Sequence, residues 1–105
     1  MATPESKVKR RVKAILKEYE PEIWANWPVP VGYGTPMLDC IGSFRGLSFA
    51  IETKAPGEKP TPRQLATMRE MRRGGVKVFL IDGEKWPYSW LELWLQTTAL
   101  GSLRQ

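Results

Sequence analysis

The sequence predicts a small α/β domain with a mixed sheet flanked by helices, in the order α-β-β-α-β-α along the chain. Residues 4–19 and 62–73 each carry apolar side chains at helical spacing behind a Thr-Pro start. A hairpin pattern over 37–54 precedes the second helix and an apolar run over 76–82 follows it, so the sheet has an antiparallel and a parallel part. At 105 residues the chain, 1–105, is expected to form a single domain.

The first helix is predicted from about Pro4 to Tyr19, with Thr3 as its N-cap. Its apolar stripe consists of Val8, Val12, Ile15, Leu16 and Tyr19. Glu5 lies three residues before Val8, which puts its carboxylate at the core-facing edge of the first turn. An acid at this place either complements the helix dipole or belongs to a functional site, and both interpretations stand at this point.

Residues 20–36 are rich in proline and glycine and have neither helical nor strand periodicity, which predicts an ordered loop anchored by Trp24 and Trp27. Two strands are expected next, over 37–42 and 47–54, joined by a turn at 43–46.

The predicted hairpin brings charged residues together. Alternation along its second strand places Glu52 and Lys54 on one face. If the turn has four residues, Gly42 pairs with Leu47, and Asp39 falls opposite Ala50 with Glu52 as its diagonal neighbour. A change of one residue in turn length would put Asp39 and Glu52 on opposite faces of the sheet.

The second helix is predicted from about Pro62 to Arg73, with Thr61 as N-cap and Gly74-Gly75 as the stop. Its inner stripe is Leu65, Met68 and Met71, and Gln64 lies at the margin of that stripe. The apolar run 76–82 predicts a buried strand parallel to its neighbour, and a final helix is expected over about Tyr88 to Leu95.

The absence of histidine and the presence of one cysteine, Cys40, exclude several kinds of chemistry. The chain cannot form a Ser-His-Asp or Cys-His nucleophile, a Cys/His zinc cluster or an internal disulfide. Cys40 alternates away from Asp39, which predicts a small core residue. Any chemistry must therefore use carboxylates, lysine, hydroxyls or a bound metal ion.

The chain carries a net charge of +5, concentrated in residues 1–20 and 54–77, with a pI near 9.6. This favours a polyanionic partner such as nucleic acid, although many basic proteins bind none. No apolar run is long enough to span a membrane, and no signal-peptide pattern opens the sequence. The expected location is therefore the reducing cytoplasm.

Several motifs in one order resemble the PD-(D/E)XK nuclease superfamily and, within it, stand-alone minimal members of the VRR-NUC family of phage and bacterial type. They are Glu5, the stretch Gly34-Thr35-Pro36-Met37-Leu38-Asp39, the triplet Glu52-Thr53-Lys54, Gln64 and the strand from Gly75 to Ile81. The triplet alone is a weak signal, but Asp39 precedes Glu52 by thirteen residues and Gln64 follows Lys54 by ten, which makes the set more specific. The resemblance covers about residues 3–82 and implies a restriction-endonuclease-like core.

The resemblance implies a Mg²⁺-dependent DNA endonuclease that hydrolyses phosphodiester bonds, with Mn²⁺ as a substitute ion. Asp39 and Glu52 would hold the ion, together with the backbone carbonyl of Thr53. Lys54 would hold the attacking water or stabilise developing phosphate charge. Without the resemblance, Asp39, Glu52 and Lys54 would be interpreted as an ordinary surface ion-pair cluster.

Two further residues take roles from the same resemblance. Glu5 would bind a second ion or orient a metal-bound water, and Gln64 would fix Lys54 or contact the substrate. The expected nucleic-acid contacts are Lys7, Arg10, Arg11, Lys59 and Arg63. A merely solvated set of charges is the alternative for these basic residues. A non-catalytic nucleic-acid-binding module that retains the nuclease fold is the alternative for the whole protein.

Stand-alone members of this family resemble homodimeric resolvases of branched DNA such as Holliday junctions, in which two sites cut symmetrically related strands. The predicted helix at 88–95 is apolar nearly all round and includes Trp90 and Trp94, which suits a dimer interface. The alternative is that the loop at 20–36 covers this helix through Trp24 and Trp27 within one chain. Base stacking is a third use for the tryptophans, and packing or subunit contact is favoured over it.

Overall fold

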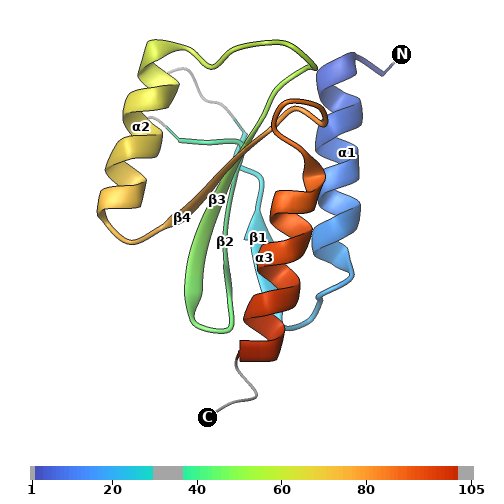
Figure 1. Ribbon diagram of the computed structural model, residues 1–105, viewed down its shortest axis with the longest axis vertical. Coiled ribbons are helices and arrows are strands. Elements are labelled where there is room, and N and C mark those ends of the chain that lie inside the picture. The colour runs from blue at the N-terminus through green and yellow to red at the C-terminus, as the bar shows by residue number, and fades with distance from the viewer. Residues whose placement is uncertain (1, 30–36, 102–105) are drawn as a thin grey trace.

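The computed structural model describes residues 2–29 and 37–101 (Figure 1). Within them, four strands form one sheet in the order β1-β2-β3-β4. The elements are α1 (Pro4–Lys17), β1 (Ile23–Asn26), β2 (Cys40–Phe44), β3 (Leu47–Thr53), α2 (Pro62–Arg73), β4 (Lys77–Ile81) and α3 (Tyr88–Gly101). The first three strands are antiparallel, whereas β3 and β4 run parallel. The predicted α/β fold with a mixed sheet is confirmed, with one more strand than expected.

Helices cover both faces of the sheet: α1 and α3 lie side by side on one face, and α2 lies on the other (Figure 1). Phe49 and Ile51 of β3 point into the larger core cluster under α1 and α3. Ala50, between them, points into the smaller cluster with Met68 of α2. Because strand side chains alternate between faces, Glu52 belongs to the α2 side of the sheet.

Both predicted helix starts are confirmed. The Thr3 hydroxyl accepts a hydrogen bond from the Ser6 N–H at 3.1 Å and caps α1. Thr61 caps α2, whose bounds match the prediction. The first helix ends at Lys17 instead of Tyr19, because the Glu18 N–H bonds back to the carbonyls of the last turn and closes the helix.

One position of the predicted α2 stripe is wrong. Met68 is buried and Met71 partly buried, but Leu65 is 40% exposed. It lies beside Leu80 and Trp86 in an open groove at the β4 edge instead of packing inward. Cys40 is buried as predicted, and burial raises the pKa of its thiol to about 12.

The prediction of an ordered loop without a strand over 20–36 is wrong where β1 forms. β1 pairs with β2 along its length, Trp24 opposite Ser43, and this pairing makes a strand of residues whose own pattern is too short to indicate one. Trp24 is 60% exposed and anchors nothing, whereas Trp27 is partly buried against the larger core cluster.

The hairpin turn is shorter than predicted. Arg45 and Gly46 form it with φ values of 51° and 84°, and positive φ at both central residues matches the twist of the flanking strands. Cys40 therefore pairs with Ile51, so the predicted register is wrong by two residues. A shift of two preserves the face of every side chain, and the next pair along the ladder is Asp39 and Glu52.

The last helix is longer than predicted, from Tyr88 to Gly101 instead of ending at Leu95. The prediction stopped where the apolar run stopped, but the Thr97 hydroxyl bonds to the Leu93 carbonyl at 2.9 Å and the helix continues. No helix among residues 2–29 and 37–101 is long and apolar enough to cross a membrane.

Candidate active site

The structure brings Asp39, Glu52, Thr53, Lys54 and Gln64 together where β2 begins and β3 ends, against the first turn of α2. Asp39 directly precedes β2, and Glu52 and Thr53 are the last residues of β3. The part Gly34-Thr35-Pro36 of the motif before Asp39 lies outside the described residues. The predicted convergence of the remaining polar side chains is therefore present in the fold.

Asp39 is held by the end of β3. Its Oδ2 accepts hydrogen bonds from the Thr53 N–H at 2.9 Å and from the Thr53 hydroxyl at 2.8 Å. Its own N–H donates to Glu52 Oε1 at 3.2 Å. These bonds leave Oδ1 of Asp39 without a hydrogen-bond donor among the described residues, with Lys9 Nζ 4.0 Å away.

Glu52 is 3% exposed, so its carboxylate depends on protein groups for its polar contacts. Gln64 Nε2 donates to Glu52 Oε2 at 2.8 Å, and Lys54 Nζ lies 3.7 Å from the same oxygen. The sequence allowed Gln64 to fix Lys54 or to contact the substrate; in the structure it holds Glu52. The Lys54 side chain is itself only 11% exposed, so its ammonium is held beside Glu52.

Burial raises the pKa of Glu52 to about 7, and the nearby charges of Asp39 and Glu5 act in the same direction. The Lys54 ammonium and the hydrogen bond from the Asp39 N–H oppose the rise. Glu5, in the first turn of α1, is therefore close enough to act electrostatically on Glu52. The raised pKa of Glu52 reflects burial and the nearby negative charge of Asp39, both of which a bound cation would offset.

Asp39 and Glu52 are the two carboxylates of the site that could supply ligands to a divalent ion. Among the described residues, no group of three or more acidic or cysteine side chains is close enough to do so, so Glu5 stands apart from Asp39 and Glu52. The N–H and carbonyl of a strand residue point to the same side, so the Thr53 carbonyl faces the side of Asp39, to which its N–H donates. Two carboxylates, one carbonyl and water fit Mg²⁺, which commonly keeps several waters.

A further acid near the site, Asp82, was not predicted from the sequence. Asp82, at the end of β4, is fully buried and accepts hydrogen bonds from the N–H groups of Gly57, Glu84 and Trp86 at 3.2, 2.8 and 3.0 Å. Burial opposes its ionisation, but these donors outweigh burial and lower its pKa. Asp82 fixes the loop that follows Lys54. The sequence feature that could have indicated this role is the pair Asp82-Gly83, which is typical of a turn.

The basic residues predicted to contact nucleic acid are all exposed: Lys7, Arg10, Arg11, Lys59 and Arg63. Arg11 also has partners in the fold, because its guanidinium lies 3.9 Å from Glu92 and over the ring of Tyr88. Arg63 and Lys59 flank the start of α2, next to Gln64. Lys59 and Arg63 therefore lie at the α2 side of the carboxylate site, whereas Arg11 of α1 faces Glu92 and Tyr88.

No protein-family model matches the chain, and no curated protein matches it.

Proposed function

We propose that this protein is a Mg²⁺-dependent DNA endonuclease with a PD-(D/E)XK core of the VRR-NUC type, selective for branched DNA such as Holliday junctions. The observation that carries the proposal is the setting of Glu52 at the strand ends. It accepts the N–H of Asp39, feels the charge of the Asp39 carboxylate and lies 3.7 Å from the Lys54 ammonium. A protein that only binds DNA gains nothing by placing acids where phosphate must approach. The basic helices around the site supply the attraction for the polyanion.

Asp39 and Glu52 would bind the ion through their carboxylates, with the Thr53 carbonyl beside them. A bound Mg²⁺ supplies a nucleophilic water at neutral pH and countercharge for the phosphate. Thr53 keeps Asp39 in place through two hydrogen bonds to Oδ2, and Gln64 keeps Glu52 in place through Oε2. Both carboxylates are thus oriented before any ion arrives, which reduces the reorganisation required on binding.

Lys54 is the residue of this site best suited to act on the reacting groups. Its ammonium is held near Glu52 Oε2 by a buried stem, yet its protons remain available to other oxygens. It would orient the attacking water or stabilise the negative charge that develops on the phosphate.

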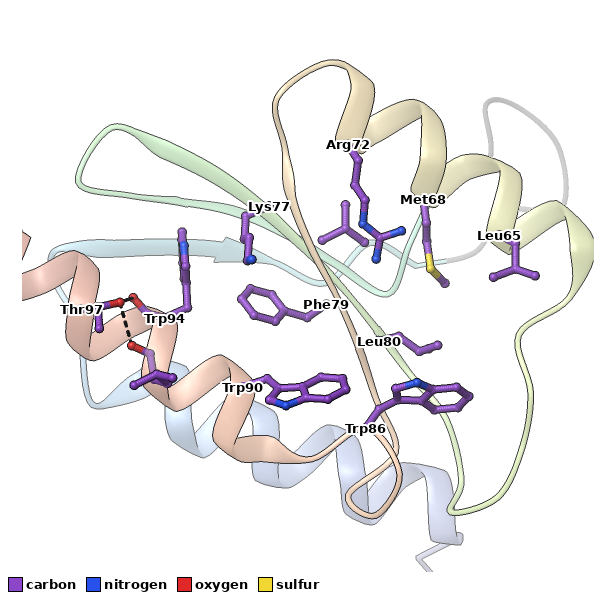
Figure 2. Close-up of a pocket in the computed structure, with 12 residues that line it drawn as sticks. Leu65, Met68, Arg72, Lys77, Phe79, Leu80, Trp86, Trp90, Trp94 and Thr97 are labelled. Carbon is purple, nitrogen blue, oxygen red and sulfur yellow. Dashed lines mark hydrogen bonds between the residues drawn. The ribbon is translucent and has the colours of Figure 1, made fainter.

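Symmetric cutting of a junction requires two such sites, and we propose a homodimer formed through α3. A groove of about 550 Å³ runs along the free edge of β4 between α2 and α3 (Figure 2). Trp90 and Leu93 of α3 are 50% and 60% exposed beside it. Neither Trp24 nor Trp27 lines this groove, and residues 30–36 of the same loop lie outside the described residues.

The activity is tested with a four-way junction, a flap and a plain duplex of matched sequence. Each is incubated with the protein in Mg²⁺ and, separately, in a chelator. Paired cuts in the junction that require Mg²⁺ and exceed those in the duplex are expected. Tight binding without cleavage under all metal conditions would instead favour the non-catalytic nucleic-acid-binding module.

A further inference from the structure

Lys9 brings a positive charge from α1 to the carboxylate site, although it was not among the residues expected there. Its Nζ lies 4.0 Å from Asp39 Oδ1 and 5.9 Å from the centre of the Trp27 ring. The Lys9 side chain is 34% exposed, so it is free to leave the carboxylate without unpacking the core.

The oxygen that faces Lys9 is the one left open on Asp39. Oδ2 already accepts from both the N–H and the hydroxyl of Thr53. Oδ1 accepts no hydrogen bond from the described residues, so it retains its lone pairs for a cation. An ammonium near this oxygen and a divalent ion bound to it would repel each other strongly at such short range.

We propose that Lys9 is the internal counter-cation of the metal-free site and that it competes with the divalent ion for Asp39 Oδ1. The inference rests on the proposed metal site and deepens it. In the metal-free protein, Lys9 offsets part of the charge of Asp39 while Lys54 offsets part of that of Glu52. When the ion binds, Lys9 is released from Asp39 and its charge becomes available to a nucleic-acid phosphate.

The test measures Mn²⁺ binding to the full chain without DNA, from the electron paramagnetic resonance signal of the free ion. Lys9→Met keeps an unbranched side chain, one atom shorter, but removes its charge, and Lys9→Gln is a second, more polar variant. Lys13→Met is the matched control, because Lys13 is on the same helix and lies over the same Trp27 ring, 4.9 Å from its centre. Circular dichroism establishes that each variant is folded.

Both Lys9 variants are expected to bind Mn²⁺ about fivefold more tightly than the wild type, the size of one exposed ion pair. Lys13→Met should keep the wild-type dissociation constant for Mn²⁺. Lys9→Arg should also keep it, because this variant retains the positive charge beside Asp39. In a chelator the Lys9 variants should melt at a lower temperature than the wild type, and saturating Mn²⁺ should narrow that gap.

Unchanged or weaker Mn²⁺ binding by the Lys9 variants would overturn the proposal, as would equal tightening by Lys13→Met, which would assign the effect to net charge. A different pattern would mark failure of the metal site itself: folded wild type and variants would all leave the Mn²⁺ signal unchanged. That result would overturn the role of Lys9 together with the proposed function.

Discussion

Gln64 donates a 2.8 Å hydrogen bond from Nε2 to Glu52 Oε2, while its Oε1 accepts the N–H of Thr61 at 2.9 Å. One amide therefore completes the capping box of α2 and orients the carboxylate at the end of β3. A carboxylate at this position would serve the cap equally well but would repel Glu52. The requirement for an amide thus comes from the site and not from the helix.

The two roles of Gln64 can be separated by comparing Gln64→Ala with Thr61→Ala. Each variant breaks the capping box and should lose about 1 kcal/mol of stability. Only Gln64→Ala also releases Glu52, so only this variant should lower cleavage or Mg²⁺ affinity, by about 10- to 100-fold. Thermal melting and cleavage rates measured side by side test this. Equal loss of activity in both variants would show that Gln64 acts only as a helix cap.

The paired carboxylates should be indispensable for cleavage. Asp39→Asn and Glu52→Gln remove one charge each while preserving the size of the side chain. Either change should lower the rate on the order of a thousandfold or more. DNA binding in a chelator should persist or tighten, because negative charge has been removed. Cutting by either variant at a near wild-type rate would contradict the site assignment.

The raised pKa of Glu52 predicts a pH-dependent loss of stability in the metal-free protein. Burial and the charge of Asp39 raise this pKa from 4.5 to about 7. The folded state therefore binds the proton more tightly than the unfolded state, so this stabilisation is complete below pH 4.5 and is lost as pH rises through 7.

Glu52→Gln cannot ionise and should escape this loss. Relative to the wild type in a chelator, it should become more stable between pH 4.5 and 7, by about 3 kcal/mol at the upper end. Denaturant unfolding across this pH range measures the difference, and Mg²⁺ at pH 8 should reduce it by stabilising the wild type alone. If the free energy of unfolding varied with pH in the same way for both proteins, the raised pKa of Glu52 would be contradicted.

The parts of this fold that could be predicted from sequence are those set by neighbouring residues. Thr3 and Thr61 cap their helices through contacts three residues away, so both starts could be found. β1 is an edge strand whose only partner in the described sheet is β2, and its existence depends on that distant pairing. The turn at Arg45 depends on a non-glycine residue with positive φ, which the sequence does not mark.

The candidate site divides in the same way. Spacing and alternation placed Asp39 near Glu52, because a register error of two residues leaves every side chain on its face. The partner of Gln64 and the approach of Lys9 to Asp39 depend on how α2 and α1 dock on the sheet, which no local pattern encodes.

The exposed basic residues should carry affinity for DNA without sequence preference. Replacing Lys7, Arg10 and Arg11 together by alanine should lower the slope of log affinity against log salt by about 0.9 for each phosphate that the variant no longer neutralises. Arg11→Ala alone should contribute least, because Arg11 already pairs with Glu92. Fluorescence anisotropy at several salt concentrations, on junction and duplex DNA, measures both effects. An unchanged slope in the triple variant would leave these residues as solvated charges.

Dimerisation through α3 should depend on Trp90 and Leu93 and not on Trp94. The Trp94 ring makes edge-on contacts with Phe44, Phe49 and Phe79, with centroids 5.6 to 6.5 Å apart, so its loss would unfold the core. The pair Trp90→Glu, Leu93→Glu instead charges only the exposed side of the helix.

The matched control is Trp24→Glu, since Trp24 is 60% exposed on β1 at the opposite edge of the described sheet. Light scattering should find a dimer for the wild type and for this control, and a folded monomer for the Trp90 and Leu93 pair. Because a monomer brings only one site to a junction, the Trp90→Glu, Leu93→Glu double variant should nick one strand where the wild type makes two cuts. A wild type that is monomeric at tens of micromolar, the range where a weak dimer still forms, yet makes paired cuts would exclude this interface.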